Sequence, residues 1–335
     1  MKKEVKKVAV AFSGGVDSST SAFLLKKEGF EVTALFIKLF NSKELEDKAR
    51  KLAKEIGIDF KIIDLRKEFK RRVIDYFIKS YKIGITPNPC VVCNKEIKFG
   101  LFLEKVKKLK FDYFATGHYA KILKKNDGLH LLKADDLRKD QSYFLYRLSQ
   151  KQLAKVIFPL SNYTKEDVRK IAKKNKISSF GFTESQEVCF ASDFVYFFKK
   201  QLGEKNGETV DKKGKVLGCH NGLWFYTIGQ RKGIGLSGGP YFVIKKDFKK
   251  NRLVVSKEEK DLLSRELKFG KVNWILKEPI FPAKIKAKIR YGHNPASGIL
   301  TKNKIVFNKP QRAITPGQSV VFYKGKEVIG GGIII

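Results

Sequence analysis

The chain has 335 residues, of which 42% are hydrophobic, and its 70 Lys and Arg against 34 Asp and Glu give a formal net charge of +36. This length allows two or three domains, and the positive excess favours a polyanionic partner, nucleic acid before membrane. The apolar stretch Val8–Phe12 is too short for a signal peptide, and no apolar run reaches transmembrane length. The sequence therefore predicts a cytoplasmic protein without a membrane partner.

Residues 1 to about 115 alternate short apolar runs with amphipathic segments. We expect strands over Val8–Phe12, Glu31–Ile37, Phe60–Leu65 and Phe111–Thr116, and helices over Ser19–Glu28, Lys43–Ile56, Lys67–Lys79 and Lys95–Lys108. This order predicts an α/β fold with a doubly wound parallel sheet. Because ligands of such sheets lie beyond the carboxyl ends of the strands, segments 13–18, 37–38 and 117–118 should meet at one edge.

The character of the chain changes near Gly203. Helices are expected to continue from 120 to 200, including Asp167–Lys174 and Phe194–Leu202, with Ser192 as the cap of the latter. Beyond Gly203, glycines, turn signals and short alternating runs dominate. We therefore predict a catalytic α/β domain over residues 1–202, a small β-rich domain over 203–270 and a C-terminal β-barrel over 271–335.

The loop Ser13–Ser18, with the sequence SGGVDS, joins the first strand to the first helix. A glycine-rich turn of this kind leaves backbone N–H groups free at the positive end of a helix, which suits phosphate. It is not a Walker A loop. The chain's single G-x-G-x-x-G, Gly233–Gly238, precedes a strand and so fails as a dinucleotide site. The loop therefore predicts a nucleotide site of another class.

The four cysteines are Cys90, Cys93, Cys189 and Cys219. So few cysteines in a large cytosolic chain indicate redox chemistry, metal binding or catalysis rather than structural disulfides. Asn94 is a candidate N-cap, which would place Cys93 just before a helix and close to Lys95, and both features stabilise a thiolate. A zinc half-site and a pair of buried thiols are the alternatives for Cys90 and Cys93.

Eight stretches taken together, in this order, resemble the tRNA-specific 2-thiouridylase family, one of the PP-loop ATP pyrophosphatases. They are FSGGVDSS, TPNPCVVCNKEIKF, ATGHYA, KDQSYFL, SQEVCF, YTIGQRKGIG, RYGHNP and TPGQSVVFY, and they span nearly the whole chain. The resemblance implies that ATP adenylates the C2 oxygen of the wobble uridine and releases pyrophosphate. Sulfur then replaces the adenylated oxygen, which makes the protein a tRNA sulfurtransferase.

The resemblance also assigns residues. ATP would be bound by Ala11, Phe12, Ser13, Gly14, Gly15, Val16, Asp17, Ser18, Ile37 and Gly117, with Asp17 orienting Mg²⁺ or the loop itself. The anticodon arm of tRNA would contact Asn88, Pro89, Cys90, His118, Lys139, Asp140, Gln141, Arg290, Tyr291 and Gln318. Cys189 would receive a persulfide from a sulfur-carrier or cysteine-desulfurase relay protein, and Cys93 would attack it. We expect a monomer bound to one tRNA.

Two departures from the family pattern leave alternatives open. Many members carry Asp, the candidate acid–base group, where this chain has Cys90, so the acid–base role is unassigned, and Cys90 is counted with Cys93 and Cys189 as a candidate catalytic residue. Cys90, Cys93 and Cys189 are alternatively three ligands of a [4Fe–4S] cluster with one iron open to sulfide. The second departure, a shorter connection at Phe40–Lys43, should matter little, and Cys219 is expected to be structural.

Two different functions compete with thiolation. One is a different PP-loop ligase or amidotransferase that adenylates another carbonyl substrate and needs neither Cys93 nor Cys189. The other is a basic RNA-binding protein without catalytic activity. The intact Asp17 and the three cysteines count against the second.

Overall fold

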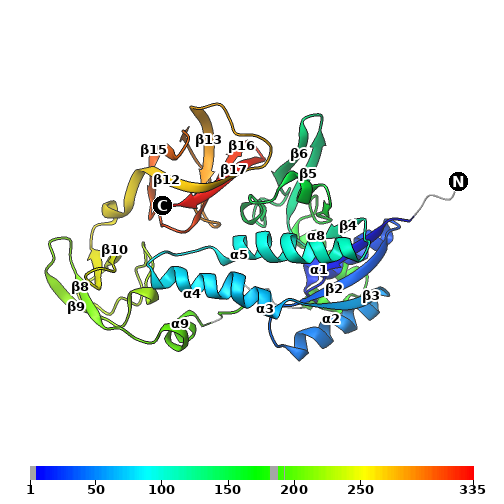
Figure 1. Ribbon diagram of the computed structural model, residues 1–335, viewed down its shortest axis with the longest axis horizontal. Helices are drawn as coiled ribbons and strands as arrows, with labels where there is room; N and C mark the ends of the chain where they lie inside the picture. The colour runs from blue at the N-terminus through cyan, green and yellow to red at the C-terminus, as the bar shows by residue number, and fades with distance from the viewer. Residues whose placement is uncertain (1–4, 182–187, 192) are drawn as a thin grey trace.

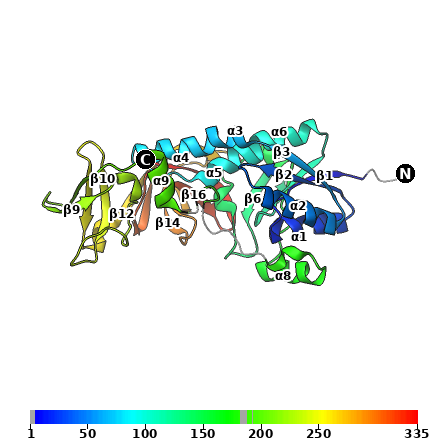
Figure 2. The same ribbon diagram turned by 90° about the horizontal axis from the view of Figure 1, so that it is seen from below.

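The computed structural model describes residues 5–181, 188–191 and 193–335. The predicted cap Ser192 and the first half of the SQEVCF stretch lie outside the described residues. Figure 1 shows a parallel sheet at one end of the molecule and two β-rich parts at the other, bridged by long helical segments. Figure 2 shows the same division from below, with α8 (Lys165–Lys174) beside α1 (Val16–Lys27).

The first sheet is parallel and five-stranded, in the order β3-β2-β1-β4-β7, as the sequence predicts. Its strands are β1 Lys7–Ala11, β2 Glu31–Lys38, β3 Asp59–Asp64, β4 Tyr113–Ala115 and β7 Val156–Ile157. Alternate residues of β1 point to opposite faces, so Val8 and Val10 pack with α1, α2 (Lys43–Ile56) and α8. Ala9 packs on the other face, against the helices between β3 and β4. The sheet is therefore doubly wound.

The helix predicted over Lys95–Lys108 begins earlier than expected. It starts as α5, Pro89–Val92, continues as a π-helix over Cys93–Phe102 and ends as α6, Leu103–Lys108. Asn88 is the N-cap, since its side chain accepts from the Val91 N–H, and Pro at the first helical position lacks the N–H that would go unpaired there. The prediction of Asn94 as N-cap is wrong, because Asn94 lies inside the helix and donates to the Phe144 carbonyl.

The neighbouring helix is interrupted in the same way. It consists of α3 (Arg66–Phe69), a π-helical turn (Lys70–Ile74) and α4 (Asp75–Lys82). α2 has the bounds predicted for it and ends at Gly57, whose φ of 68° is the left-handed conformation that favours glycine. The remaining helices are α7 (Gln150–Leu153) and α9 (Phe194–Leu202), and the Asp193 side chain caps α9.

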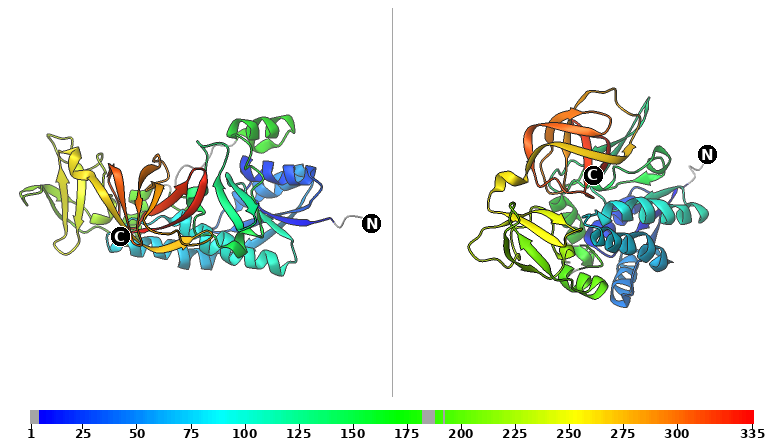
Figure 3. Two further views of the ribbon diagram at one scale, coloured as in Figure 1. Left: turned by 90° about the horizontal axis from the view of Figure 1, so that it is seen from above. Right: turned by 60° about the vertical axis from the view of Figure 1, so that its left-hand side comes forward.

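The expectation of helices directly after residue 120 is wrong. The chain forms a hairpin there, β5 (Ala120–Lys125) and β6 (Gly128–Lys133). Asn126 and Asp127 form the turn and Gly128, with a φ of 136°, follows it, so the run Asn-Asp-Gly is a turn signal that the prediction overlooked. β6 pairs with the C-terminal strand through Leu131↔Val328, and Figure 3 shows the hairpin beside the barrel.

The C-terminal region is the predicted barrel, closed by pairing of its first and last strands, β12 and β17. Its strands are β12 Leu263–Trp274, β13 Ala283–Lys288, β14 Ala296–Leu300, β15 Lys304–Arg312, β16 Ser319–Lys324 and β17 Glu327–Ile334. The middle sheet has the order β10-β11-β8-β9, from β8 Gly207–Val210, β9 Val216–His220, β10 Phe242–Asp247 and β11 Arg252–Ser256. The boundaries at 202 and 270 stay a prediction. Within the described part of the chain, no helix combines the length and the apolar character needed to cross a bilayer.

Candidate active site

A cavity of about 490 Å³ lies at the carboxyl edge of the parallel sheet, where the sequence places the ligand. Small-molecule sites measure roughly 300–1,000 Å³. The predicted site residues that line it are Ala11, Phe12, Ser13, Asp17, Ser18, Ile37, Pro89, Cys90, Cys93, Gly117, His118, Gln141 and Cys189. We call residues 13–18 the loop wall, and Cys90, Cys93, Lys98 and Cys189 the cysteine wall.

Other predicted site residues do not line the cavity. They are Gly14, Gly15, Val16, Asn88, Lys139, Asp140, Arg290, Tyr291 and Gln318. The first three still belong to the loop: Gly14 has a φ of 77°, and Gly15 is the N-cap of α1 without a side-chain capping bond. The turn is fixed by the Ser18 hydroxyl, which donates to the Gly15 carbonyl at 3.0 Å. The uncapped end of α1 thus points its positive pole at the cavity.

Asp17 in the loop wall is held by two residues that sequence reasoning missed. Its Oδ1 lies 2.6 Å from the Lys165 ammonium and accepts from the Tyr119 hydroxyl at 2.8 Å. Lys165 is 6% exposed. The helix predicted over Asp167–Lys174 starts two residues earlier, at Lys165, behind a capping box of Thr164 and Asp167. No local pattern shows that the first residue of that helix turns inward to a carboxylate so far away in the sequence.

Gly117 closes the loop wall from the side of β4. A Cβ atom at this position would lie 2.9 Å from the Asp17 carbonyl carbon and 3.0 Å from the Ser18 nitrogen. Real Cβ atoms essentially never approach backbone so closely, so only glycine lets the two segments touch. The glycine of ATGHYA is therefore required by packing against the loop, whatever else it does.

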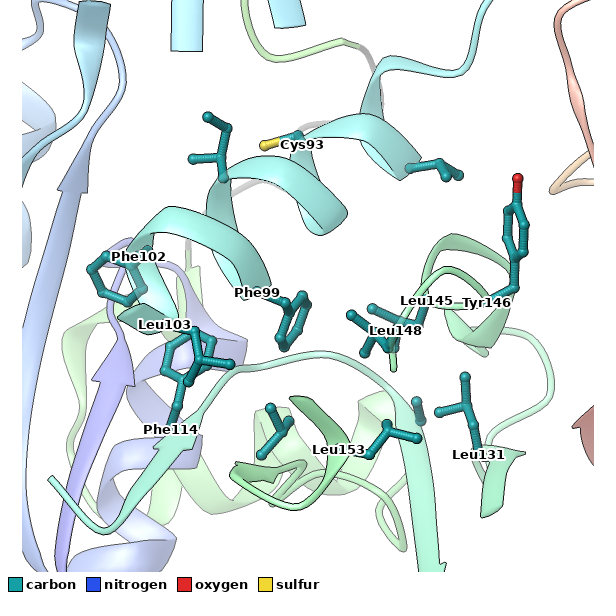
Figure 4. Close-up of a cluster of buried hydrophobic side chains, with 14 of the residues drawn as sticks. Cys93, Phe99, Phe102, Leu103, Phe114, Leu131, Leu145, Tyr146, Leu148 and Leu153 are labelled. Carbon is teal, nitrogen blue, oxygen red and sulfur yellow. The ribbon is translucent and has the colours of Figure 1, made fainter. Parts of the chain in front are cut away.

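The cysteine wall is assembled from two distant segments. Cys90 and Cys93 come from α5 and the start of the π-helix, and Cys189 comes from residues 188–191. Figure 4 shows Cys93 on the helix that carries Phe99, Phe102 and Leu103 into the core. Cys90 and Cys189 are exposed to the cavity, whereas Cys93 is 9% exposed.

The thiols are not activated in the way the sequence suggested. Burial raises the pKa of Cys93 to about 12, and Lys98 opposes this rise while the Cys189 and Cys90 thiols add to it. Cys90 and Cys189 reach the surface of the cavity, but the protein atoms around them displace enough solvent to raise the pKa of both thiols, again against Lys98. The prediction of a thiolate stabilised by a helix start and Lys95 is wrong. Cys93 lies beyond the first turn, and the lysine that acts on all three thiols is Lys98.

The [4Fe–4S] alternative can be tested on the donor set. Among the residues that the structure describes, no group of three or more His, Cys, Asp or Glu side chains is arranged to hold a metal ion. Cys90, Cys93 and Cys189 share one cavity wall without forming a ligand set. The arrangement thus does not fit a cluster.

His118 faces the cavity as a neutral ring. Burial, assisted by the charge of Lys98, lowers its pKa well below the usual range. Its Nδ1 lies 2.7 Å from the Thr116 hydroxyl, and the ring packs against Phe99 and Phe158. A neutral imidazole can exchange a hydrogen bond with a base or ribose but adds no positive charge for a phosphate.

Asp140 and Arg290, both predicted to contact tRNA, make hydrogen bonds inside the chain. Asp140 is 3% exposed, and its carboxylate accepts from the Ala134 and Ser142 N–H groups and from the Ser142 hydroxyl. The Arg290 guanidinium donates to Thr315 Oγ1 at 2.6 Å and to two backbone carbonyls, one of them in the middle region. Their contact with tRNA stays a prediction.

Gln318 connects the barrel to the segment that precedes the cysteine wall. Its Nε2 donates to the Thr86 carbonyl at 3.0 Å, and the Thr86 N–H donates to the Pro316 carbonyl. These bonds fix the segment just before Asn88 and Cys90. The ring centroid of Tyr291 lies 4.5 Å from that of Phe144, at an interplanar angle of 39°, and Phe144 lines the cavity. The barrel therefore shapes the rim of the site.

Three families together cover the chain. The tRNA methyl transferase HUP domain matches residues 6–193, the tRNA methyl transferase PRC-barrel domain residues 195–257 and the aminomethyltransferase β-barrel domain residues 264–334. The HUP domain accounts for the parallel sheet and its phosphate loop. The chain is thus a HUP-domain protein with two appended β domains.

Curated relatives narrow the class further. The protein of Syntrophomonas wolfei named tRNA-specific 2-thiouridylase MnmA is 46% identical over 98% of this chain and 99% of its own length. Proteins of the same name from Halothermothrix orenii and Clostridium botulinum are 46% and 44% identical, each over 98% of both chains. This chain belongs to the tRNA-specific 2-thiouridylase family. Membership in a PP-loop family implies the use of ATP and Mg²⁺.

Proposed function

We propose that this chain converts the wobble uridine of tRNA to 2-thiouridine in two steps within one cavity. ATP first adenylates the C2 oxygen, and pyrophosphate is released on the loop wall. Sulfur delivered from the cysteine wall then displaces AMP. The observation that carries the proposal is that a single cavity joins the phosphate loop to three thiols from distant parts of the sequence.

The sulfur step uses two thiols and balances as follows. A relay protein leaves Cys189 as a persulfide. The Cys93 thiolate attacks the inner sulfur, so that a Cys93–Cys189 disulfide forms and hydrosulfide leaves. Hydrosulfide adds to C2, the C2–O bond breaks and its electron pair leaves with AMP. A dithiol reductant then restores both thiols.

The loop wall supplies the nucleotide chemistry. Backbone N–H groups at the start of α1 bind the departing pyrophosphate, and the apolar surface beside Ile37 receives the adenine. Asp17 is the cavity carboxylate that would hold Mg²⁺, which neutralises charge on the phosphates. Lys165 and Tyr119 fix that carboxylate in place. The same residues orient Asp17 toward the cavity.

The rim of the cavity binds the anticodon arm. His118, Lys139, Gln141 and Tyr291 contact the nucleotide, while Asn88, Pro89 and Cys90 border the flipped base. The polar groups of three further residues are largely occupied by hydrogen bonds inside the chain, so these residues mainly hold the rim in shape and contact RNA through their remaining surface. They are Asp140, Arg290 and Gln318. The net charge of +36 makes binding strongly salt-dependent. We further propose that the enzyme acts as a monomer and that its sulfur relay partner docks near exposed Cys189.

The test is an assay of all products with unmodified tRNA, ATP and a sulfide or persulfide source. We expect pyrophosphate and AMP in equal amounts, together with 2-thiouridine on nucleoside analysis of the tRNA. Pyrophosphate without any dependence on tRNA would instead support a PP-loop ligase acting on another carbonyl. Tight tRNA binding with no ATP turnover would support the non-catalytic RNA-binding alternative.

Iron and sulfide analysis of protein purified without oxygen tests the thiol scheme separately. We expect colourless protein to be active with a persulfide donor. Brown protein whose activity follows its iron content would overturn the persulfide scheme and leave the adenylation step untouched.

A further inference from the structure

The cavity contains one lysine that no step above uses. Asp17 and Lys98 are the two side chains with full charge that line the cavity, since His118 is neutral. Asp17 is already paired with Lys165. In the part of the chain that the structure describes, Lys98 has no carboxylate within ion-pair distance, although ion pairs engage many of the other lysines. A lysine without a carboxylate partner at a nucleotide cavity calls for an anionic ligand.

The π-helix explains why Lys98 lies on the same wall as Cys93. In an α-helix, residues five apart point about 140° away from each other. In the π-helix over Cys93–Phe102, hydrogen bonds run from i to i+5, so residues five apart fall on successive turns of one face. Both Cys93 and Lys98 therefore face the cavity. Gly100, with φ −96° and ψ −106°, interrupts the helix just beyond Lys98.

The Lys98 ammonium acts electrostatically on every thiol of the cysteine wall. Its positive charge opposes the rise that burial causes in the pKa of each of the three thiols, and it adds to the lowering that burial causes in the pKa of His118. Lys95, two positions away from the start of the π-helix, does not line the cavity and instead faces the charge of Arg147. The two lysines of this segment thus have different surroundings, and Lys95 serves as a matched control.

We propose that Lys98 binds the α-phosphate of the nucleotide, the phosphate that stays on the tRNA as AMP after pyrophosphate has left. This inference rests on the proposed function and adds the residue that holds the leaving group. Pyrophosphate belongs to the loop wall, and sulfur comes from the cysteine wall. The α-phosphate must therefore lie between the two walls, within reach of a cation on the cysteine wall.

The charge of Lys98 acts when sulfur displaces AMP. As the C2–O bond breaks, its electron pair moves onto the phosphate oxygen, and the negative charge of the phosphate grows. A fixed ammonium beside that oxygen stabilises the transition state more than the ground state. The step transfers no proton to or from Lys98, so it needs no further reactant.

The test is equilibrium binding of AMP and of pyrophosphate, by calorimetry, to the full-length protein without tRNA or sulfur donor. We expect Lys98→Met to weaken AMP binding roughly 10-fold or more, because a charge-assisted contact is lost. Pyrophosphate binding should change less than about two-fold. Lys98→Arg should retain most of the AMP affinity, and Lys95→Met should bind both ligands like the parent protein. Thermal unfolding of each variant identifies any that misfold.

The inference is overturned if Lys98→Met binds AMP normally, if it loses pyrophosphate affinity to the same extent, or if the parent protein does not bind AMP at millimolar concentration. These outcomes are separate from the proposed function, because neither ligand requires tRNA or sulfur. If Lys98→Met loses AMP affinity in a protein that cannot thiolate tRNA, the phosphate role stands and the thiolation proposal fails.

Discussion

The loop wall and the cysteine wall differ in how their polar groups are satisfied. In the loop wall, the Asp17 carboxylate has a cation and a hydroxyl as partners, and serine hydroxyls tie the turn together. In the cysteine wall, three thiols sit where burial opposes their ionisation, beside a lysine without a carboxylate partner among the described residues. The charged group of the first wall therefore already has its partners, whereas in the second wall the thiols resist ionisation and the lysine has no such partner.

The largest expected effect comes from removing sulfur chemistry while keeping adenylation. Cys93→Ser should lower thiolation by about 10³-fold or more, as loss of a nucleophile does. ATP–pyrophosphate exchange in the presence of tRNA should stay within about three-fold of the parent, because the loop wall is unchanged. Cys219→Ser is the matched control, since this exposed cysteine on β9 lies outside the cavity. Thiolation retained by Cys93→Ser would contradict the scheme.

The resting state of the cysteine wall is measurable by alkylation. In a variant that keeps only Cys93, iodoacetamide at pH 8 should react at least about 100-fold more slowly than with a free thiol, because the pKa is raised to about 12. The rate should still be rising at pH 10, since a raised pKa moves the thiolate to higher pH. A plateau below pH 8 would show that the Cys93 thiol is already ionised at rest.

The loop wall should respond to loss of its buried cation. Lys165→Met leaves the Asp17 carboxylate partly buried without its cation, so we expect the KM for ATP to rise roughly 30-fold and the protein to lose about 1–3 kcal/mol of stability. The figure lies below the usual range for a fully buried pair because Asp17 is 30% exposed. Lys165→Met with Asp17→Asn should recover stability in urea unfolding but not ATP affinity. Recovery of both would show that the pair is only structural.

The smallest effects come from two glycines, Gly117 beside the loop wall and Gly100 on the helix that carries Cys93 and Lys98. Gly117→Ala places a Cβ 2.9 Å from the Asp17 backbone, and Gly100→Ala places one 2.7 Å from the Lys95 carbonyl oxygen. Each should cost about 1–3 kcal/mol in unfolding experiments. Gly117→Ala should raise the KM for ATP several-fold, and the rate of thiolation at limiting ATP should fall by the same factor. Gly100→Ala should slow sulfur transfer alone. Equal effects on both steps would mean that the walls are not independent.

Regions with local signals were predicted well. The parallel sheet, the helix Lys43–Ile56 with its Gly57 stop and the C-terminal barrel follow from periodicity, caps and turn residues. The start of the helix at Pro89 was missed although Asn88 followed by Pro89 is a recognisable helix start in the sequence. The β5–β6 hairpin was missed although its turn residues Asn126 and Asp127, followed by Gly128, are a visible turn signal.

For the site itself, the sequence alone determined the phosphate loop, the cysteines and the strand ends that converge on one edge. These depend on short-range rules: a glycine-rich turn between strand and helix, and parallel strands whose carboxyl ends share one side. Only the tertiary structure decided that Lys165 pairs with Asp17 and that Lys98 lines the cavity. Lys165 and Lys98 are ordinary lysines in a lysine-rich chain, and their places follow from the docking of α8 on α1 and from a π-helix whose extra residue per turn no local pattern announces.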